Sequence, residues 1–244
     1  MVKNNQASIF LRALKISLPL VFFLFLFCSI WYVVQALQNP NVLPIKSITI
    51  SADAQNIPAS TLKNLVAENA RGGFFSLNTG ALKNSLMSLP WVKSVDIQRV
   101  WPNQLNIKIK ERHVLQLWGS TGAIDQDGNL FSPAADTLPK NLPQLNGPND
   151  HVADVVSLYK TLSGSLAPLP LTINNLTLSD RGSWQLQLSN GLLVILGGDD
   201  MAARFKKFVS LYPKIIGDNE SKALTIDLRY PNGVAVQWKH AKPT

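Results

Sequence analysis

A charge-free apolar run near the start of the chain constrains its architecture most. No charged residue occurs from Ile16 to Leu37, and the stretch from Leu20 to Ile30 consists mostly of Leu, Phe and Val. At about 1.5 Å per residue, a helix over this run measures about 33 Å, enough to cross a hydrocarbon core of roughly 30 Å. The pattern therefore predicts one transmembrane helix over residues 16–37.

A cleaved signal peptide is the alternative interpretation of this run. The apolar stretch is longer than the roughly 7–15 residues of a signal-peptide core, and no small-x-small cleavage motif follows it. The segment Gln35–Gln38 contains only one small residue, Ala36. We therefore expect an uncleaved anchor.

Charged residues on either side of the run set its expected orientation. Lys3, Arg12 and Lys15 precede it without any acidic residue, whereas the first charge after it is Lys46. The positive-inside rule then predicts a single-pass type II protein, with a cytoplasmic stub of residues 1–15 too short to fold and residues 38–244 outside.

The predicted topology places part of the chain's positive net charge on each side of the membrane. The net charge is +8, and removing the three charges of the stub leaves +5 outside. A basic surface can bind nucleic acid, but none is expected beyond the membrane. The only cysteine, Cys28, lies in the predicted span, so the exterior part depends on its apolar cores rather than on an intrachain disulfide.

Residues 45–112 have the pattern of a small α+β domain. Residues 38–44 contain Pro40 and Pro44 and predict a short extended linker. The expected elements are a strand at 45–51, a helix from Ala59 to Gly72, a helix capped by Asn78 or Thr79 and ending before Pro90, and two strands at 95–98 and 105–109. We expect an antiparallel sheet with two helices on one face.

Residues 113–244 predict a second, β-rich domain of mainly antiparallel strands with flanking helices. The expected elements are a strand at 114–118, a hairpin turning at Asp127-Gly128, a helix from about Asp150, a hairpin turning at Asn190-Gly191, and a helix capped by Asp199 or Asp200 and stopped by Pro213. Residues 132–149 contain four prolines and predict a surface loop.

The chain closes with a predicted hairpin. Leu224, Ile226, Leu228 and Tyr230 alternate with polar neighbours, and after the turn Pro231-Asn232-Gly233 the residues Val234, Val236 and Trp238 alternate again. Alternation over both segments is typical of half-buried strands.

No pattern in the sequence predicts catalysis, a metal or a cofactor. The three histidines, His113, His151 and His240, are scattered, and no nucleophile elbow or zinc motif occurs. The segment Asp125–Asn129 spaces its oxygens like a calcium loop. However, its glycine is fourth rather than sixth, so a hairpin turn explains it better.

Two groups of residues resemble the FtsQ/DivIB cell-division family. In the first domain, which resembles the polypeptide-transport-associated (POTRA) domain of that family, the matching residues are Leu89-Pro90-Trp91-Val92, Val95, Arg99, Trp101-Pro102, Leu105 and Glu111-Arg112. In the second domain they are Ser183–Leu186, Phe205–Pro213, Asp227–Tyr230, Gly233 and Val236–Trp238. Val114 departs from the family pattern, which often has proline there.

The resemblance implies a non-catalytic role in the bacterial inner membrane at the division septum. Members of this family link earlier-arriving division proteins, such as FtsK, to later ones. Their periplasmic β domain binds the FtsB–FtsL pair, which contributes to the control of septal peptidoglycan synthesis. No small-molecule substrate is implied.

The resemblance also implies a partner-binding site in the closing hairpin. A last strand at a sheet edge leaves N–H and C=O groups that a partner strand can pair with. The residues implied are Arg229, Tyr230, Asn232, Gly233, Val234, Val236 and Trp238. The structural alternative is that Val234 and Val236 are simply core residues of a half-buried strand.

Other functions compete with this interpretation. A POTRA-containing envelope assembly or secretion factor usually has several such domains and a membrane barrel, which this sequence does not predict. An envelope hydrolase would need a nucleophile, a metal motif or a carboxylate pair. A third alternative is a membrane-anchored protein without a division role, and no sequence motif would distinguish such a protein.

Overall fold

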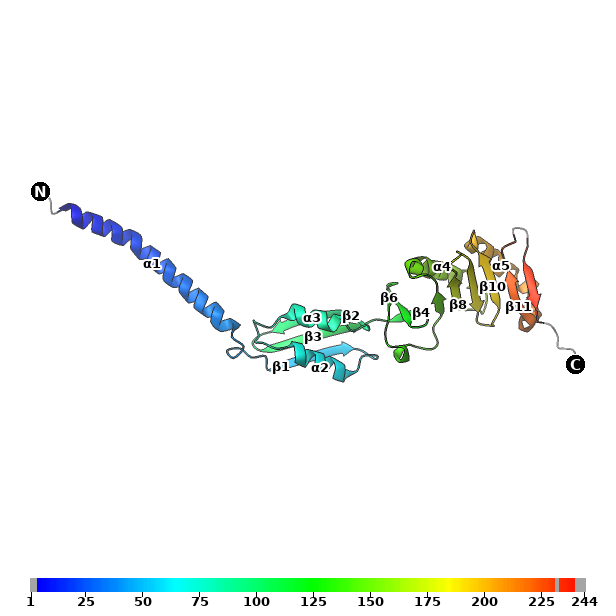
Figure 1. Cartoon of the computed structure of the whole chain (residues 1–244), viewed down its shortest axis with the longest axis horizontal. Helices are drawn as coiled ribbons and strands as arrows, with labels where there is room; N and C mark the ends of the chain where they lie inside the picture. The colour runs from blue at the N-terminus through cyan, green and yellow to red at the C-terminus, as the bar shows by residue number, and fades with distance from the viewer. Residues whose placement is uncertain (1–3, 231–232, 240–244) are drawn as a thin grey trace. The chain divides into compact units, whose positions relative to one another are not determined.

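The structure is a computed structural model that describes residues 4–230 and 233–239, with the backbone alone for residues 4–20, 218, 220 and 221. The chain divides into two compact units, and the boundary lies between Glu111 and Arg112 (Figure 1). The N-terminal unit contains α1 and a small α+β domain. The C-terminal unit contains a single large sheet with two helices.

Helix α1 spans Asn4–Gln38. Within the described residues it is the one helix long and apolar enough to cross a membrane, with a mean hydropathy of 1.9 over Val21–Gln38. The predicted N-terminal apolar helix is therefore confirmed. Trp31 and Tyr32 are 60% and 74% exposed on it, like most other large apolar side chains of this segment.

The structure corrects two details at the ends of α1. The helix begins at Asn4, inside the predicted stub, because no glycine or proline interrupts residues 4–18. After Gln38 the chain does not extend but turns, and the Val42 N–H donates to the Asn39 C=O at 3.1 Å. Pro40 follows Asn39, at the turn position that suits the fixed φ of proline.

The small domain has the predicted order β-α-α-β-β. Its elements are β1 Ser47–Asp53, α2 Ala59–Asn69, α3 Thr79–Met87, β2 Val92–Val100 and β3 Gln104–Glu111. The expectation of an antiparallel sheet is wrong for β1. The order is β1-β3-β2, and β1 pairs parallel to β3. The connection from β1 to β3 contains α2, α3 and also β2, so it is long enough for a parallel crossover.

Specific side chains close this domain around its apolar core. Asn78 caps α3, and its Oδ1 accepts the Ala81 N–H at 2.9 Å. Buried Glu111 accepts the N–H groups of Gln55 and Asn56 at 2.6 and 3.0 Å. Arg99, one of the family marks, donates to the Leu77 C=O at 2.8 Å. The bonds of Glu111 and Arg99 join the sheet to the loops that precede α2 and α3.

The C-terminal unit is built on a nine-stranded sheet. Its strands are β4 Val114–Trp118, β5 Gly122–Asp125, β6 Leu130–Phe131, β7 Gln144–Asn146, β8 Ile173–Leu178, β9 Trp184–Leu188, β10 Leu193–Gly197, β11 Ala223–Asp227 and β12 Ala235–Trp238. Their order is β12-β11-β10-β9-β8-β7-β4-β5-β6. Most pairs are antiparallel, as predicted, but β4–β7, β7–β8 and β10–β11 are parallel.

The predicted surface loop at 132–149 is partly wrong. It contains the internal strand β7, and Leu145 in its centre is fully buried. Strand β8 was also not predicted. The stretch Gln144–Asn146 has a single apolar residue, so it cannot show the alternation of apolar and polar residues that indicates a strand. In β8 the ladder register shifts between Ile173 and Asn175, which obscures the alternation.

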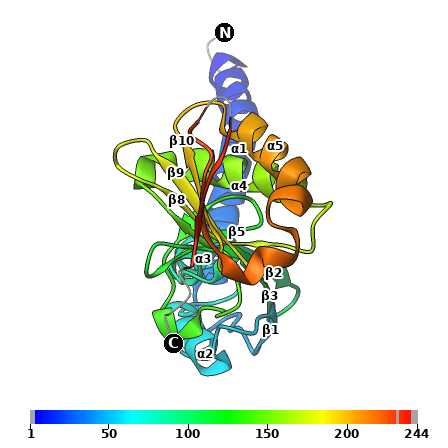
Figure 2. The same cartoon turned by 90° about the vertical axis from the view of Figure 1, so that its right-hand side faces the viewer.

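Two helices, α4 Val152–Ser165 and α5 Met201–Ile215, cover one face of this sheet. They contact each other, and α4 packs on β7 and β8 while α5 packs on β10 (Figure 2). Short 3₁₀ turns occupy Ala135–Thr137, Asn149–His151 and Gly217–Lys222. Gln185 and Gln187 of β9 are exposed, so the opposite face of the sheet is open at this strand.

The expected start of α5 is confirmed, but its side-chain cap and its expected end need correction. Asp200 occupies the N-cap position, but it has a positive φ of 48° and its side chain accepts no capping hydrogen bond. Pro213 lies inside the helix, which ends at Ile215. A proline in the last turn removes only one N–H donor, so the helix can continue for two more residues.

The segment Asp125–Asn129 is a hairpin turn between β5 and β6, as predicted. Buried Asp125 accepts the N–H groups of Asp127 and Asn129 through Oδ1, both at 2.9 Å. Its Oδ2 lies 2.7 Å from Nη1 of Arg112. All the acceptor capacity of this carboxylate therefore serves the fold.

Candidate partner-binding edge

Strand β12 lies at one end of the nine-stranded sheet. Among the described residues it pairs only with β11, antiparallel, with Asp227 opposite Ala235 and Ile226 opposite Val236. The sequence-predicted residues Val236 and Trp238 are both on this strand. An edge strand has one side whose backbone N–H and C=O groups are not paired within the sheet, so a strand of another chain can pair with β12 there.

The ladder determines which residues direct their backbone groups to the open side. The Lys239 N–H donates to the Lys222 C=O at 2.8 Å, so Lys239 faces β11. Successive residues of an extended strand direct their N–H and C=O groups to opposite sides. Ala235 and Gln237 therefore also face β11, whereas Val236 and Trp238 point their backbone groups away from the sheet.

Exposed aromatic rings accompany this free edge. Tyr230 is 57% exposed and Trp238 is 40% exposed. Val234 and Val236 are partly buried and pack against the core. The edge therefore combines anchored valines with accessible aromatic side chains, the residue type that dominates binding energy in protein interfaces.

The expected alternation of β11 is wrong at Leu224. Ile226 and Leu228 are buried, but Leu224 is 42% exposed. The pairing with β12 shifts register between Ala223 and Thr225, and such a bulge turns one side chain to the other face.

Arg229 is held by a neighbouring carboxylate. Its Nη2 lies 2.6 Å from Oδ2 of Asp227, and its Nε lies 3.0 Å from both carboxylate oxygens. The hydrogen bond from Arg229 lowers the pKa of Asp227, and Asp227 raises that of Arg229. Gly233 is exposed, and Asn232 lies outside the described residues.

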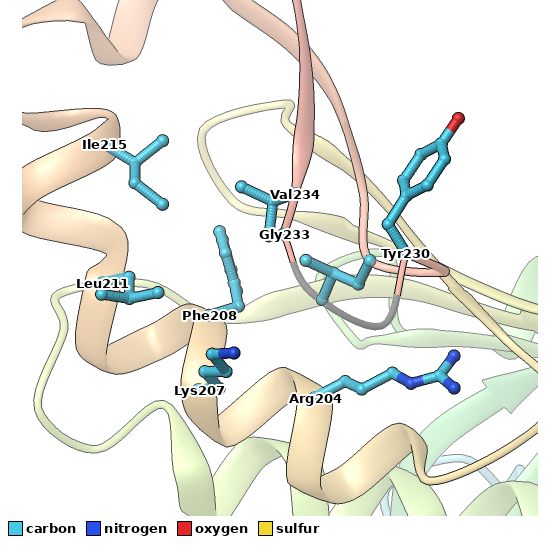
Figure 3. Close-up of a pocket in the computed structure, with 9 residues that line it drawn as sticks. Arg204, Lys207, Phe208, Leu211, Ile215, Tyr230, Gly233 and Val234 are labelled. Atoms are coloured by element: carbon cyan, nitrogen blue, oxygen red, sulfur yellow. The ribbon is translucent and has the colours of Figure 1, made fainter.

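A groove lies beside this edge, between α5 and the closing hairpin (Figure 3). It encloses about 220 Å³. Its lining is mostly apolar, with two cations: Arg204, Lys207, Phe208, Leu211, Ile215, Leu228, Tyr230, Gly233 and Val234. Three of the sequence-predicted site residues, Tyr230, Gly233 and Val234, thus belong to it.

Sequence reasoning missed the α5 side of this groove. Phe208 lies on the apolar face of this amphipathic helix and is 1% exposed. Arg204 and Lys207 were not singled out. The available signal was charge: α5 carries four cations, Arg204, Lys206, Lys207 and Lys214, and no acidic residue.

The histidines do not form a site in the described part of the chain. His151 Nδ1 lies 2.8 Å from Oδ2 of Asp154, and this hydrogen bond raises the pKa of His151. No group of three potential metal ligands comes together among the described residues. His240 lies outside them.

Comparison with known proteins agrees with this architecture. The family model "POTRA domain, FtsQ-type" matches residues 43–112, and the model "Cell division protein FtsQ/DivIB, C-terminal" matches residues 116–229. The cell division protein FtsQ of Coxiella burnetii is 40% identical over 230 residues, which cover 94% of this chain and 95% of that protein. The chain belongs to the FtsQ cell-division family.

Other FtsQ relatives match most of the chain as well. The FtsQ protein of Xanthomonas campestris pv. campestris is 33% identical over 80% of this chain and 69% of its own length. That of Burkholderia pseudomallei is 31% identical over 82% of each. The C-terminal family model ends at Arg229, so β12 and its free edge lie beyond the matched segment.

Proposed function

We propose that this chain is a non-catalytic scaffold of the division septum that binds the FtsB–FtsL complex through strand addition to β12. The single observation that carries the proposal is the position of β12 at a sheet edge, with the backbone groups of Val236 and Trp238 directed away from β11. Strand addition needs such a free edge. Membership of the FtsQ family supports the choice of partner.

The proposed partner site comprises two kinds of residue. Val236 and Trp238 contribute backbone donors and acceptors, while Tyr230 and Trp238 contribute exposed rings. Arg229, Asn232, Gly233 and Val234 complete the site that the family resemblance implies. Because Arg229 is already paired with Asp227, its proposed contribution is a fixed, rather than a mobile, positive charge.

The proposed topology rests on the N-terminal apolar helix and on the basic residues Lys3, Arg12 and Lys15 that precede its apolar run. Residues 1–15 are cytoplasmic, 16–37 cross the inner membrane, and 38–44 link to the POTRA domain at 45–112. The β domain at 113–244 is periplasmic. In this arrangement the chain connects earlier division proteins, such as FtsK, to FtsB–FtsL and so contributes to the control of septal peptidoglycan synthesis.

Charge substitution of the exposed aromatics tests the partner site. We expect Tyr230→Glu or Trp238→Glu in the full-length chain to weaken FtsB–FtsL capture by at least about tenfold, since aromatic interface residues commonly contribute about 2 kcal/mol or more. Trp101→Glu is the matched control, because Trp101 is 76% exposed in the other unit. Unchanged capture by Trp238→Glu, with a native circular dichroism spectrum, would reject the site.

A further inference from the structure

One end of the small domain exposes large apolar side chains that the proposed partner site does not use. At the turn between β2 and β3, Val100 is exposed and Trp101 is 76% exposed. Phe75, in the loop before α3, and Val42, in the segment after α1, are exposed as well. Exposed apolar side chains that gather in one place indicate contact with another molecule or with a membrane.

Backbone hydrogen bonds hold the segments that carry these side chains together. The Phe74 N–H donates to the Leu43 C=O at 2.8 Å, and the Lys46 N–H donates to the Asn103 C=O at 2.9 Å. Arg99 also fastens the end of β2 to the loop before α3. The segment after α1, the loop and the β2–β3 turn therefore meet at one end of the domain. Its exposed apolar residues, here called the apolar end, are Val42, Phe75, Val100 and Trp101.

The apolar end follows closely on the helix that can cross a membrane. Helix α1 ends at Gln38, and the Val42 N–H then donates to the Asn39 C=O in a turn. Because neighbouring Cα atoms are about 3.8 Å apart and such a turn keeps its outer Cα atoms within about 7 Å, the Leu43 Cα lies within about 15 Å of the Gln38 Cα. Any angle between α1 and the domain thus keeps the apolar end within reach of the lipid headgroups.

The segments that meet at this end are also positively charged. Residues 39–47, 71–80 and 98–104 contain three cations and no acidic residue. Two of these cations, Lys46 and Arg71, are exposed. Tryptophan favours the interface between membrane and water, and basic residues are attracted to anionic lipid. The combination suits the surface of a membrane that contains anionic lipid.

We infer that the small domain rests on the membrane through its apolar end, with Phe75 and Trp101 among the lipid headgroups and Lys46 and Arg71 facing anionic lipid. The inference depends on α1 spanning the membrane but not on the binding of FtsB–FtsL. A protein partner is the competing occupant. The membrane is favoured because the chain itself tethers this end to the lipid, which makes the contact intramolecular. Such docking limits the swing of the domain on its linker.

A fluorescent label at a single cysteine tests the inference in the full-length chain. The chain is reconstituted in vesicles of phosphatidylcholine and phosphatidylglycerol, and nitroxide-labelled headgroups act as quencher. Cys28, the only cysteine, is replaced by serine. Gln104→Cys places the label opposite Val100, and Ser94→Cys places it about 20 Å away along β2. We expect at least about threefold stronger quenching of the Gln104 label. Equal quenching of both labels would overturn the inference.

Removal of the aromatic rings is the second arm. Phe75→Ser/Trp101→Ser should lower the quenching of the Gln104 label to that of the Ser94 label. Both rings are exposed, so the variant should keep the melting temperature of the wild-type chain. Unchanged quenching in this folded variant would overturn the inference.

Neutralisation of the cations is the third arm. Lys46→Gln/Arg71→Gln should lower the quenching of the Gln104 label in the anionic vesicles but not in vesicles of phosphatidylcholine alone. Lys63→Gln/Lys110→Gln is the matched control. It removes the same charge from exposed positions on α2 and at the far end of β3, and it should have no effect. Equal effects of both pairs would overturn the inference.

Further outcomes separate this inference from the proposed function. If carbonate extracts the wild-type chain from the vesicles, the proposed topology and the inference are both rejected. If the Gln104 label is not quenched and Phe75→Ser/Trp101→Ser weakens FtsB–FtsL capture, the apolar end is a protein contact and the inference is overturned. If the label is quenched but the chain does not bind FtsB–FtsL, the inference stands and the proposed partner is rejected.

Discussion

A proline at Val236 should block strand addition without disturbing the fold. The Val236 N–H points away from β11, so proline removes no hydrogen bond of the sheet, and proline is tolerated at such edge positions. In the complex, however, it removes one donor and leaves a carbonyl of the partner strand unpaired. An unsatisfied buried group costs about 1–3 kcal/mol, which corresponds to binding about 5- to 150-fold weaker.

Two neighbouring variants make this prediction specific. Val236→Ala keeps the N–H and removes part of a half-buried side chain, so its binding should change less than about threefold. Ala235→Pro removes an N–H that pairs with Asp227 across the ladder, so it should lower the free energy of unfolding by about 1–3 kcal/mol. Binding is measured by calorimetric titration and stability by thermal unfolding of the full chain. Equal binding of Val236→Pro and Val236→Ala would refute the reasoning.

Two further predictions concern stability. Asp125→Ala leaves Arg112 and two backbone N–H groups without an acceptor, so urea unfolding should show a loss of about 3–5 kcal/mol; a loss below about 1 kcal/mol would contradict this. Burial alone would raise the pKa of Asp125. The hydrogen bonds from the Asn129 backbone and from Arg112 outweigh this effect, so the net pKa of Asp125 is lowered. This stabilisation should therefore be complete above the ordinary Asp pKa of about 3.9 and be lost as the pH falls below it. Gly197→Ala should cost about 1–2 kcal/mol, because φ is +82° and the new Cβ would lie 3.0 Å from Arg229 Cγ; an unchanged melting temperature would argue against it.

Local sequence signals are enough to predict an element that has its own apolar pattern or its own turn residues. The apolar run predicts α1, and Asn190-Gly191 predicts the hairpin of β9 and β10, which the structure contains. The family resemblance implies a partner site in the closing hairpin, and among the described residues β12 lies at one end of the sheet. The ladder with β11 then specifies which of its residues face outward.

Tertiary context decides the features that the sequence did not predict. Strand β7 has one apolar residue, Leu145, and it is recognisable only from its two parallel neighbours. Leu224 points outward because of a bulge, which alternation cannot show. The groove combines α5 with the closing hairpin, so Arg204 and Lys207 meet Tyr230 only after folding.

Residue-resolved amide exchange tests the strand-addition claim most directly. The Ala235 and Gln237 amides already pair with β11 in the free chain and should exchange slowly with or without partner. The Val236 and Trp238 amides should exchange rapidly in the free chain and slow by at least about tenfold when FtsB–FtsL binds. Equal exchange rates of Val236 and Trp238 in the free and the bound chain would contradict the account.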